Sequence, residues 1–291
     1  MRYVLENDVL RVEIDSFGAE LKSVIAKETE QEYMWQADPK FWARTSPVLF
    51  PFVGSLKNKQ YSYKGNIYPM GQHGFARDME HTMVSQTENE IWFELLSNEE
   101  TLEKFPMAFK LMIGYQLVDN KVKVLWNVEN PAEETLYFSI GAHPAFNCPI
   151  HGEEKKVGYS LYFGGVEEIH HHGNTETGMA LREDLVLSLS NNKVEISEEF
   201  FDRCTYMIED RQCGSVGIVD PSGRRYVTVE FDMPLFAVWS PEKKQAPFIC
   251  IEPWCGRCDA VDFEGDLQDR EFTNVLGAKE QFATEYTMIF E

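Results

Sequence analysis

Residues 111 to 129 read LMIGYQLVDNKVKVLWNVE, which is a pair of strand-like segments joined by a short turn. Apolar side chains occupy every second position from Val122 to Val128, so they share one face of a half-buried strand. The preceding residues 111–117 are strand-like as well, and Asp119 and Asn120 between the two segments tolerate the backbone of a tight turn. The segment therefore predicts an antiparallel β-hairpin.

The same alternation recurs along the chain, for example in Leu10 to Asp15. Asn191 and Asn192 offer a second tight turn, here between strand-like residues 185–189 and 194–196. Other predicted strands cover residues 91–96, 136–140, 216–219, 226–231 and 236–239. Helical periodicity is weak, and only residues 38–44, 98–103 and 198–202 are predicted to form short helices.

Many strands, few helices and the lack of a linker-like segment predict an all-β sandwich or barrel. Pro and Gly are spread along the 291 residues, and no internal repeat of fixed period is present. All-β folds of this size often form one unit, so residues 1–291 are predicted to be a single domain.

The chain is strongly acidic, with 27 Lys and Arg against 48 Asp and Glu, a formal net charge of −21. Such a surface repels phosphate backbones and anionic lipid headgroups, and the sequence has no basic patch, so we expect neither nucleic acid nor a membrane as partner. The first residues lack the apolar core of a signal peptide, which predicts a cytoplasmic protein. Its six cysteines are then expected to be free thiols.

Three segments place titratable groups beside residues that constrain the backbone: GQHGFAR at 71–77, GAHPAFN at 141–147 and CIEPWCGR at 250–257. Pro144 favours an extended conformation for His143, which predicts that this histidine lies where a strand ends. Glu252 also precedes a proline, so we expect its carboxylate half-buried at a sheet edge. A histidine beside a proline is often structural, but with His73 the three groups predict convergence on one concave face.

The three segments, in this order, resemble the aldose 1-epimerase (galactose mutarotase-like) family, in particular its LacX-type branch, across nearly the whole chain. The resemblance implies a large antiparallel β-supersandwich with a few short helices and a sugar cleft on one sheet. It also implies an isomerase that uses no cofactor and no metal. The expected ligand is a small-molecule sugar.

By the same resemblance, His143 matches the family's catalytic acid and Glu252 its general base. Exchange of sugar anomers requires removing the proton of the C1 hydroxyl while the ring oxygen receives one, so that the ring opens. A Glu252 carboxylate would take the first proton and a protonated His143 would supply the second. The unperturbed imidazole pKa of about 6.5 suits that role.

The resemblance also implies substrate-binding residues. His73, Arg44 and Arg77 are expected to hold sugar hydroxyls or the ring oxygen. The family's sugar-binding aspartate is matched to Asp202, with Asp210 and Asp232 as open alternatives. Aromatic rings offer apolar faces to a sugar, and the predicted contact is Trp239; Trp42, Phe75 and Trp254 are further candidates, with core packing as the alternative.

Two other classes of function remain open at this stage. One is a metal-dependent β-sandwich enzyme in which His73, His143 and Glu252 hold iron. The other is a non-catalytic carbohydrate-binding protein. Cys255 and Cys258 have the spacing of a zinc or redox pair, but no second pair accompanies them, so neither chemistry is predicted there. The sugar itself, free or phosphorylated, is not determined by the sequence.

Overall fold

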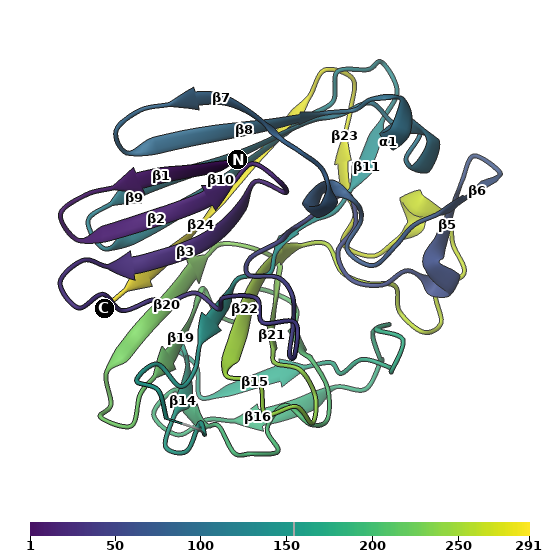
Figure 1. Cartoon of the computed structure of the whole chain (residues 1–291). Helices are drawn as coiled ribbons and strands as arrows, with labels where there is room; N and C mark the ends of the chain where they lie inside the picture. The colour runs from purple at the N-terminus through teal and green to yellow at the C-terminus, as the bar shows by residue number, and fades with distance from the viewer. Residues whose placement is uncertain (154) are drawn as a thin grey trace.

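The computed structural model describes residues 1–153 and 155–291, and all of its strand pairings are antiparallel. The largest sheet has nine strands in the order β17-β14-β19-β20-β24-β10-β9-β8-β7 (Figure 1). Their bounds are β7 Thr82–Gln86, β8 Glu90–Leu96, β9 Lys110–Val118, β10 Lys121–Glu129, β14 Ser160–Phe163, β17 Lys193–Glu195, β19 Ser215–Val219, β20 Arg225–Phe231 and β24 Gln281–Phe290. The all-β prediction is confirmed.

A second sheet of six strands has the order β18-β21-β22-β12-β4, with β13 paired beside β12 on β22. These strands are β4 Val48–Leu49, β12 Ile140–Ala142, β13 Ala145–Asn147, β18 Tyr206–Ile208, β21 Leu235–Trp239 and β22 Phe248–Cys255. Smaller sheets are formed by β1 Arg2–Glu6, β2 Leu10–Asp15 and β3 Glu20–Ala26, by β5 Gln60–Tyr63 and β6 Asn66–Pro69, by β11 Leu136–Phe138 and β23 Asn274–Leu276, and by β15 Glu168–His171 and β16 Leu185–Ser188.

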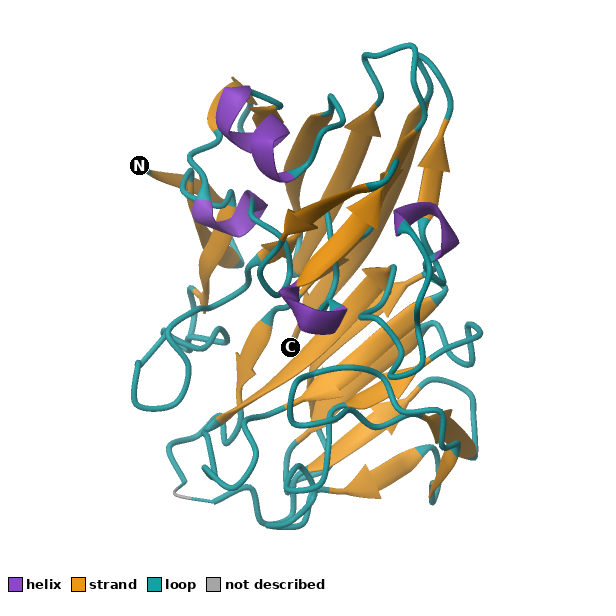
Figure 2. Cartoon of the chain, turned by 90° about the vertical axis from the view of Figure 1, so that its right-hand side faces the viewer, coloured by secondary structure: helices purple, strands orange, loops and turns teal. Residues whose placement is uncertain are grey.

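Helices are few and short in the part of the chain that is described, and they lie in connections between strands (Figure 2). They are α1 Glu99–Lys104 and the 3-10 turns Lys57–Lys59, Ala76–Asp78 and Leu267–Asp269. Asn98 caps α1, because its side chain accepts a hydrogen bond from the amide of Thr101. None of these helices is long and apolar enough to cross a lipid bilayer.

The two large sheets share one hydrophobic core. Val122, Val124 and Trp126 of β10 are at most 3% exposed and belong to the same packed cluster as Ile249 and Ile251 of β22. Each strand therefore buries alternate side chains between the sheets, as its period of two predicts.

The hairpin predicted from residues 111–129 is confirmed. Strands β9 and β10 pair from Val118 opposite Lys121 to Lys110 opposite Glu129, and Asp119 in the turn has a φ of 51°. Strand β10 also pairs with β24 along its whole length, which places the hairpin near the middle of the nine-stranded sheet.

The turn predicted at Asn191 and Asn192 is confirmed, with φ of 52° and 61°, although the strands on either side pair with different partners: β16 with β15, and β17 with β14. Two predicted helices are wrong. Residues 38–44 and 198–202 form single turns rather than helices. The carbonyl of Asp38 accepts from the amides of Phe41 and Trp42. The Phe41 ring meets Trp35 edge-on, and the Trp42 ring stacks on His143.

The side chains of β22 that do not point into the core between the sheets lie on the outer face of the six-stranded sheet. Ile249 and Ile251 lie in the core between the sheets, so Cys250, Glu252 and Trp254 project to the opposite side. Loops cover this face rather than a further sheet, which leaves room for a cavity floored by β22.

Candidate active site

A cavity of about 380 Å³ lies on the outer face of the six-stranded sheet. Its volume falls in the range of roughly 300–1,000 Å³ that is usual for small-molecule sites. The sheet supplies Met207, Trp239, Glu252 and Trp254, and the turn between β12 and β13 supplies His143. The connections between strands supply the other walls, namely Trp42, Gly54, Ser55, Gln72, His73, Arg77, Asn174, Glu176, Thr177, Gly178, Thr205 and Cys258.

His143 lies at the break between β12 and β13, as Pro144 predicts. The break leaves the two short strands in one line, both paired with β22: Gly141 opposite Trp254 and Ala145 opposite Cys250. A residue larger than glycine does not fit at position 141, since an added Cβ would come within 2.7 Å of the Trp254 ring. The side chain of His143 is thereby directed to the cavity floor.

Glu252 lies within the central strand β22 and is 1% exposed. The prediction that it is half-buried at a sheet edge is therefore wrong. Ile251 donates its amide to the carbonyl of Pro144, and amide groups two residues apart point to the same side of a strand. Pro253 thus faces the break between β12 and β13, where no ladder hydrogen bond is lost, so a proline is tolerated inside a central strand.

His143 and Glu252 form a close pair, with 3.3 Å between Nε2 and Oε2. Their side chains are only 9% and 1% exposed. Oε2 of Glu252 and Nδ1 of His143 have no hydrogen-bond partner within the protein. Buried polar atoms are normally satisfied, so both atoms are left for a ligand that enters the cavity.

Burial governs the protonation of this pair. It lowers the pKa of His143 to about 3, helped by the positive charge of Arg77. It also raises the pKa of Glu252 well above its usual value, with the neighbouring Trp254 side chain opposing the shift. Burial therefore favours a protonated carboxyl on Glu252 and a neutral imidazole on His143, and it disfavours a carboxylate beside an imidazolium.

His73 is held by a reciprocal pair of hydrogen bonds with Gly54. The amide of His73 donates to the Gly54 carbonyl, and the amide of Gly54 donates to Nδ1 of His73 at 3.0 Å. Burial, followed by the nearby His143, lowers the pKa of His73 well below its usual value. Since Nδ1 of this neutral ring accepts a hydrogen bond, the proton is on Nε2, which is the free donor of a residue that lines the cavity.

The backbone at His73 is unusual because His73 and Gly74 both have positive φ, 66° and 70°. A Cβ on Gly74 would lie 2.3 Å from the carbonyl oxygen of Phe50, so glycine is required. Of the two glycines that flank His73, Gly74 thus serves a close approach between two stretches of backbone, while nothing lies within 4 Å of a Cβ added at Gly71.

Of the two predicted arginines, Arg77 lines the cavity and Arg44 does not. Nη2 of Arg77 donates to the carbonyl of Gln72 at 2.8 Å, while its buried Nε has no hydrogen-bond partner and lies 3.7 Å from Oδ2 of Asp78. Arg44 lies in an adjoining groove and pairs with Asp78 at 2.7 Å. Both charges are close enough to lower the pKa of His143 and His73.

The predicted sugar contact Trp239 lines the cavity, as do Trp42 and Trp254. Trp42 stacks on the imidazole of His143 with ring centroids 4.7 Å apart, and Trp239 meets the same imidazole edge-on at 5.3 Å. Phe75 is different, because it packs in the main core against Phe105 and Phe109.

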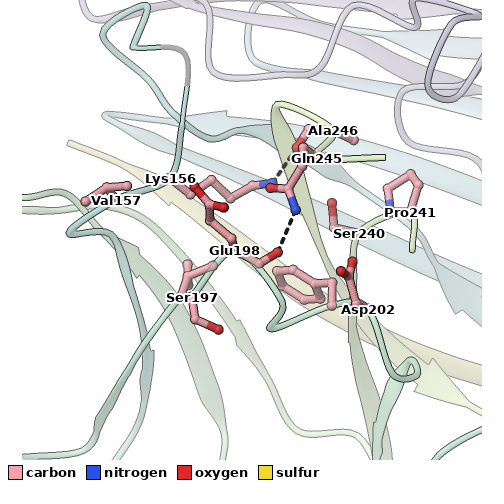
Figure 3. A pocket seen from close by; sticks show the side chains of 11 residues that line it. Lys156, Val157, Ser197, Glu198, Asp202, Ser240, Pro241, Gln245 and Ala246 are labelled. Atoms are coloured by element: carbon pink, nitrogen blue, oxygen red, sulfur yellow. Dashed lines mark hydrogen bonds between the residues drawn. The ribbon is translucent and has the colours of Figure 1, made fainter. Parts of the chain in front are cut away.

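Asp202 is not brought to this cavity. It borders a separate void of about 20 Å³, together with Lys156, Glu198 and Ser240 (Figure 3). Its carboxylate accepts a hydrogen bond from the amide of Lys243 at 2.8 Å, so it fastens the loop after β21. The alternatives Asp210 and Asp232 do not line the cavity either, and Asp232 is exposed and pairs with Arg211.

Sequence reasoning missed the loop between β15 and β16, which supplies Asn174, Glu176 and Thr177 to the cavity. The loop is held there because Gly178 packs on Ser55, where a Cβ would come within 2.6 Å of the serine oxygen. Glu176 is the second carboxylate of the lining. The sequence of this loop is polar, and no feature of it distinguishes a loop that lines a cavity from an ordinary exposed loop.

A metal centre formed by His73, His143 and Glu252 is not what the geometry offers. Among the described residues, the group whose ligand atoms come within 4.8 Å of one another is His143, Cys250 and Glu252. His73 is not a member. The pair Cys255 and Cys258 is buried and unbridged.

Comparisons with known proteins agree with this architecture. Residues 1–268 match the family model described as aldose 1-epimerase. Protein LacX of Lactococcus lactis subsp. lactis is 33% identical over 286 residues, which is 95% of each chain.

Two solved structures are similar over the full chain. A galactose mutarotase related enzyme from Lactobacillus acidophilus has a TM-score of 0.94 and 32% identity, and the match covers 100% of this chain and 97% of that one. A galactose mutarotase-like protein from Lactobacillus casei has a TM-score of 0.92 and 27% identity, with 100% of both chains covered. The fold, the site-bearing motifs and these matches together establish that the chain belongs to the aldose 1-epimerase family.

Proposed function

We propose that this protein interconverts the α and β anomers of a free hexose, with His143 and Glu252 as the acid–base pair. The observation that carries the proposal is the 3.3 Å approach of the two side chains on the floor of a sugar-sized cavity. Family membership supports a carbohydrate epimerase in general. The residue roles and the substrate are our inference.

Ring opening needs one group that accepts a proton and one that gives a proton. Glu252 takes the proton of the C1 hydroxyl, and His143 delivers one to the ring oxygen. Rotation about the C1–C2 bond and the reverse transfers then close the ring as the other anomer. Each positioned group contributes about 10²–10⁴-fold.

Burial of His143 and Glu252 favours their protonation state in the ring-opened intermediate. After ring opening Glu252 is protonated and His143 is neutral, which is the state that burial favours. The charged state that begins the cycle arises when the proton crosses from Glu252 to His143. Sugar oxygens that hydrogen-bond to the unpartnered Oε2 and to the imidazolium stabilise this charged state when the substrate binds.

The other cavity residues suit a polyhydroxylated ring. His73 offers Nε2–H, Arg77 offers guanidinium donors, and Gln72, Asn174 and Thr177 offer neutral partners. Trp239 and Trp254 supply apolar surface for the C–H faces of a sugar.

A free sugar fits the charges better than a phosphorylated one. Three of the cations that could form a basic rim are already paired: Arg44 with Asp78, Arg224 with Asp220, and Arg257 with Glu209 and Glu271. Arg77 is the arginine of the cavity lining, and its Nε lies 3.7 Å from Asp78. Glu176 adds a negative charge to the cavity wall, and the net charge of −21 gives no long-range attraction to phosphate.

Exchange between anomers, followed by NMR for a panel of free and phosphorylated hexoses, tests the proposal. We expect acceleration over the buffer rate for at least one free hexose and less for its phosphate. Binding of free hexoses without acceleration at any pH would favour a non-catalytic sugar-binding protein.

A further inference from the structure

A third side chain with a metal-binding atom lies next to the acid–base pair. His143, Cys250 and Glu252 are all buried, and their ligand atoms lie within 4.8 Å of one another. Cys250 and Glu252 are two residues apart on β22 and so share its outer face, while His143 comes from the opposing β12–β13 turn.

We propose that His143, Cys250 and Glu252 form a zinc-binding site, and that a zinc ion bound there blocks the acid–base pair. Imidazole, thiolate and carboxylate are the three side-chain ligands that zinc takes in proteins. Magnesium and calcium prefer sites built from oxygen alone, so the thiolate selects against them.

Two features indicate that these groups are available to an ion. Oε2 of Glu252, a residue that is 1% exposed, has no hydrogen-bond partner, so an ion there replaces only the 3.3 Å contact with Nε2 of His143. The cavity of about 380 Å³ reaches His143 and Glu252 and gives the ion a path of entry. It also leaves an open position for water as the fourth ligand.

The distances require only a small adjustment. Nε2 of His143 and Oε2 of Glu252 are 3.3 Å apart, close to the spacing of two ligands on one tetrahedral zinc ion. All three ligand atoms lie within 4.8 Å of one another. An adjustment of about 1 Å, through rotation of a side chain, would bring the three within bonding distance of one ion.

The charges balance as well. Zinc is bound by Cys250 as a thiolate, by Glu252 as a carboxylate and by His143 as a neutral imidazole, and any protons on these ligand atoms pass to the solvent. The two resulting anions neutralise Zn²⁺, so the occupied site adds no net charge beside Arg77. Atoms and charge are thus conserved without any redox step.

An ion at this position occupies both groups that must reach the sugar. Zinc is therefore expected to inhibit competitively with the sugar, a consequence that rests on the proposed function. Binding of the metal does not rest on it, so the two are measured separately.

The binding test uses the full-length protein freed of metal by a chelator and titrated with Co²⁺, then with Zn²⁺ against a chromophoric chelator. We expect one site per chain, with a thiolate-to-cobalt charge-transfer absorption that Zn²⁺ abolishes. Cys250→Ala should remove that absorption and weaken zinc binding by more than the roughly 10–100-fold typical of losing a residue that merely orients a ligand.

Cys213→Ala is the matched control, because Cys213 is also a buried free thiol but does not belong to the group of His143, Cys250 and Glu252. It should bind Co²⁺ and Zn²⁺ as the unaltered protein does. Folding of Cys250→Ala is checked by circular dichroism. If this variant does not fold, Cys250→Ser and the cobalt spectrum of the unaltered protein show whether the thiol of Cys250 binds the metal. A cobalt complex without thiolate absorption, or zinc affinity unchanged by loss of the thiol, overturns the site. Cys250-dependent zinc binding in a protein that accelerates no anomer exchange would instead retain the site and remove the proposed function.

Discussion

The indole of Trp42 stacks on the imidazole of His143, with ring centroids 4.7 Å apart and planes inclined by 28°. A catalytic histidine is usually oriented by a hydrogen bond to its second ring nitrogen. Here Nδ1 of His143 has no such partner, and the edge of Trp239 lies on the ring at 5.3 Å. Aromatic packing therefore sets the direction in which Nε2 points.

Replacing Trp42 tests this role. Trp42→Ala should lower kcat, by up to about a hundredfold, because a misplacement of about 1 Å is sufficient for such a loss. Trp42→Phe keeps a flat ring and should restore most of the activity. Trp92→Phe on β8, far from the cavity, is the control. Equal kcat values for Trp42→Ala and the unaltered protein, with only KM changed, would mean that Trp42 contacts the sugar without positioning His143.

The pH dependence of kcat/KM should differ from that of an ordinary histidine. The pair holds one proton between the pKa of His143, about 3, and the raised pKa of Glu252. Below the first value a second proton is bound, and above the second value the last proton is lost, so activity falls on both sides. We expect no loss between pH 7 and pH 5. An acid limb at about pH 6.5, the usual imidazole value, would contradict this protonation scheme.

One arginine variant and one aspartate variant compare a residue that lines the cavity with a residue that lies outside it. Arg77→Ala should raise KM by about 10–100-fold, the equivalent of one hydrogen bond from a charged group. Asp202→Ala should leave KM unchanged, since this carboxylate lies at another void and binds the amide of Lys243. Steady-state kinetics on the preferred hexose decide. A large rise in KM for Asp202→Ala would restore it as a sugar ligand.

Gly74→Ala tests the backbone that carries His73. The substitution combines a positive φ of 70° with a Cβ placed 2.3 Å from a carbonyl oxygen. Gly65→Ala is a matched control, because its φ is 78° but nothing lies within 4 Å of the added carbon. The control should lower the free energy of unfolding by about 1–2 kcal/mol, the cost of the left-handed conformation alone. Gly74→Ala should cost more in urea unfolding; an equal cost would show that the backbone relaxes freely.

The local alternation of apolar and polar residues predicted much of the fold. Alternation identified β10, its hairpin partner β9 and strands β8, β19, β20 and β21, because a period of two is a property of neighbouring residues. It did not predict that Asn191 and Asn192 join strands of two different sheets. Strand pairing depends on residues far away in the chain, which a turn signal does not report.

The sequence likewise predicted part of the site: it identified the residues but not the position of Glu252. The motifs at His73, His143 and Glu252 identified the groups that meet, and Pro144 located His143 at a strand break. Glu252 was expected at an edge because a proline rarely sits in a central strand. Only the gap between β12 and β13, more than 100 residues earlier in the chain, permits it there. The single-domain organisation stays a prediction.

The most direct measurement of the central claim is anomer exchange in Glu252→Gln and His143→Asn, with sugar binding measured by calorimetry on the same samples. Each substitution should reduce kcat by at least about a hundredfold while the sugar still binds. His81→Asn, which alters a buried histidine outside the cavity, should retain exchange. Exchange at the unaltered rate in both variants of the pair would contradict the account, because proton transfer would then not depend on His143 or Glu252.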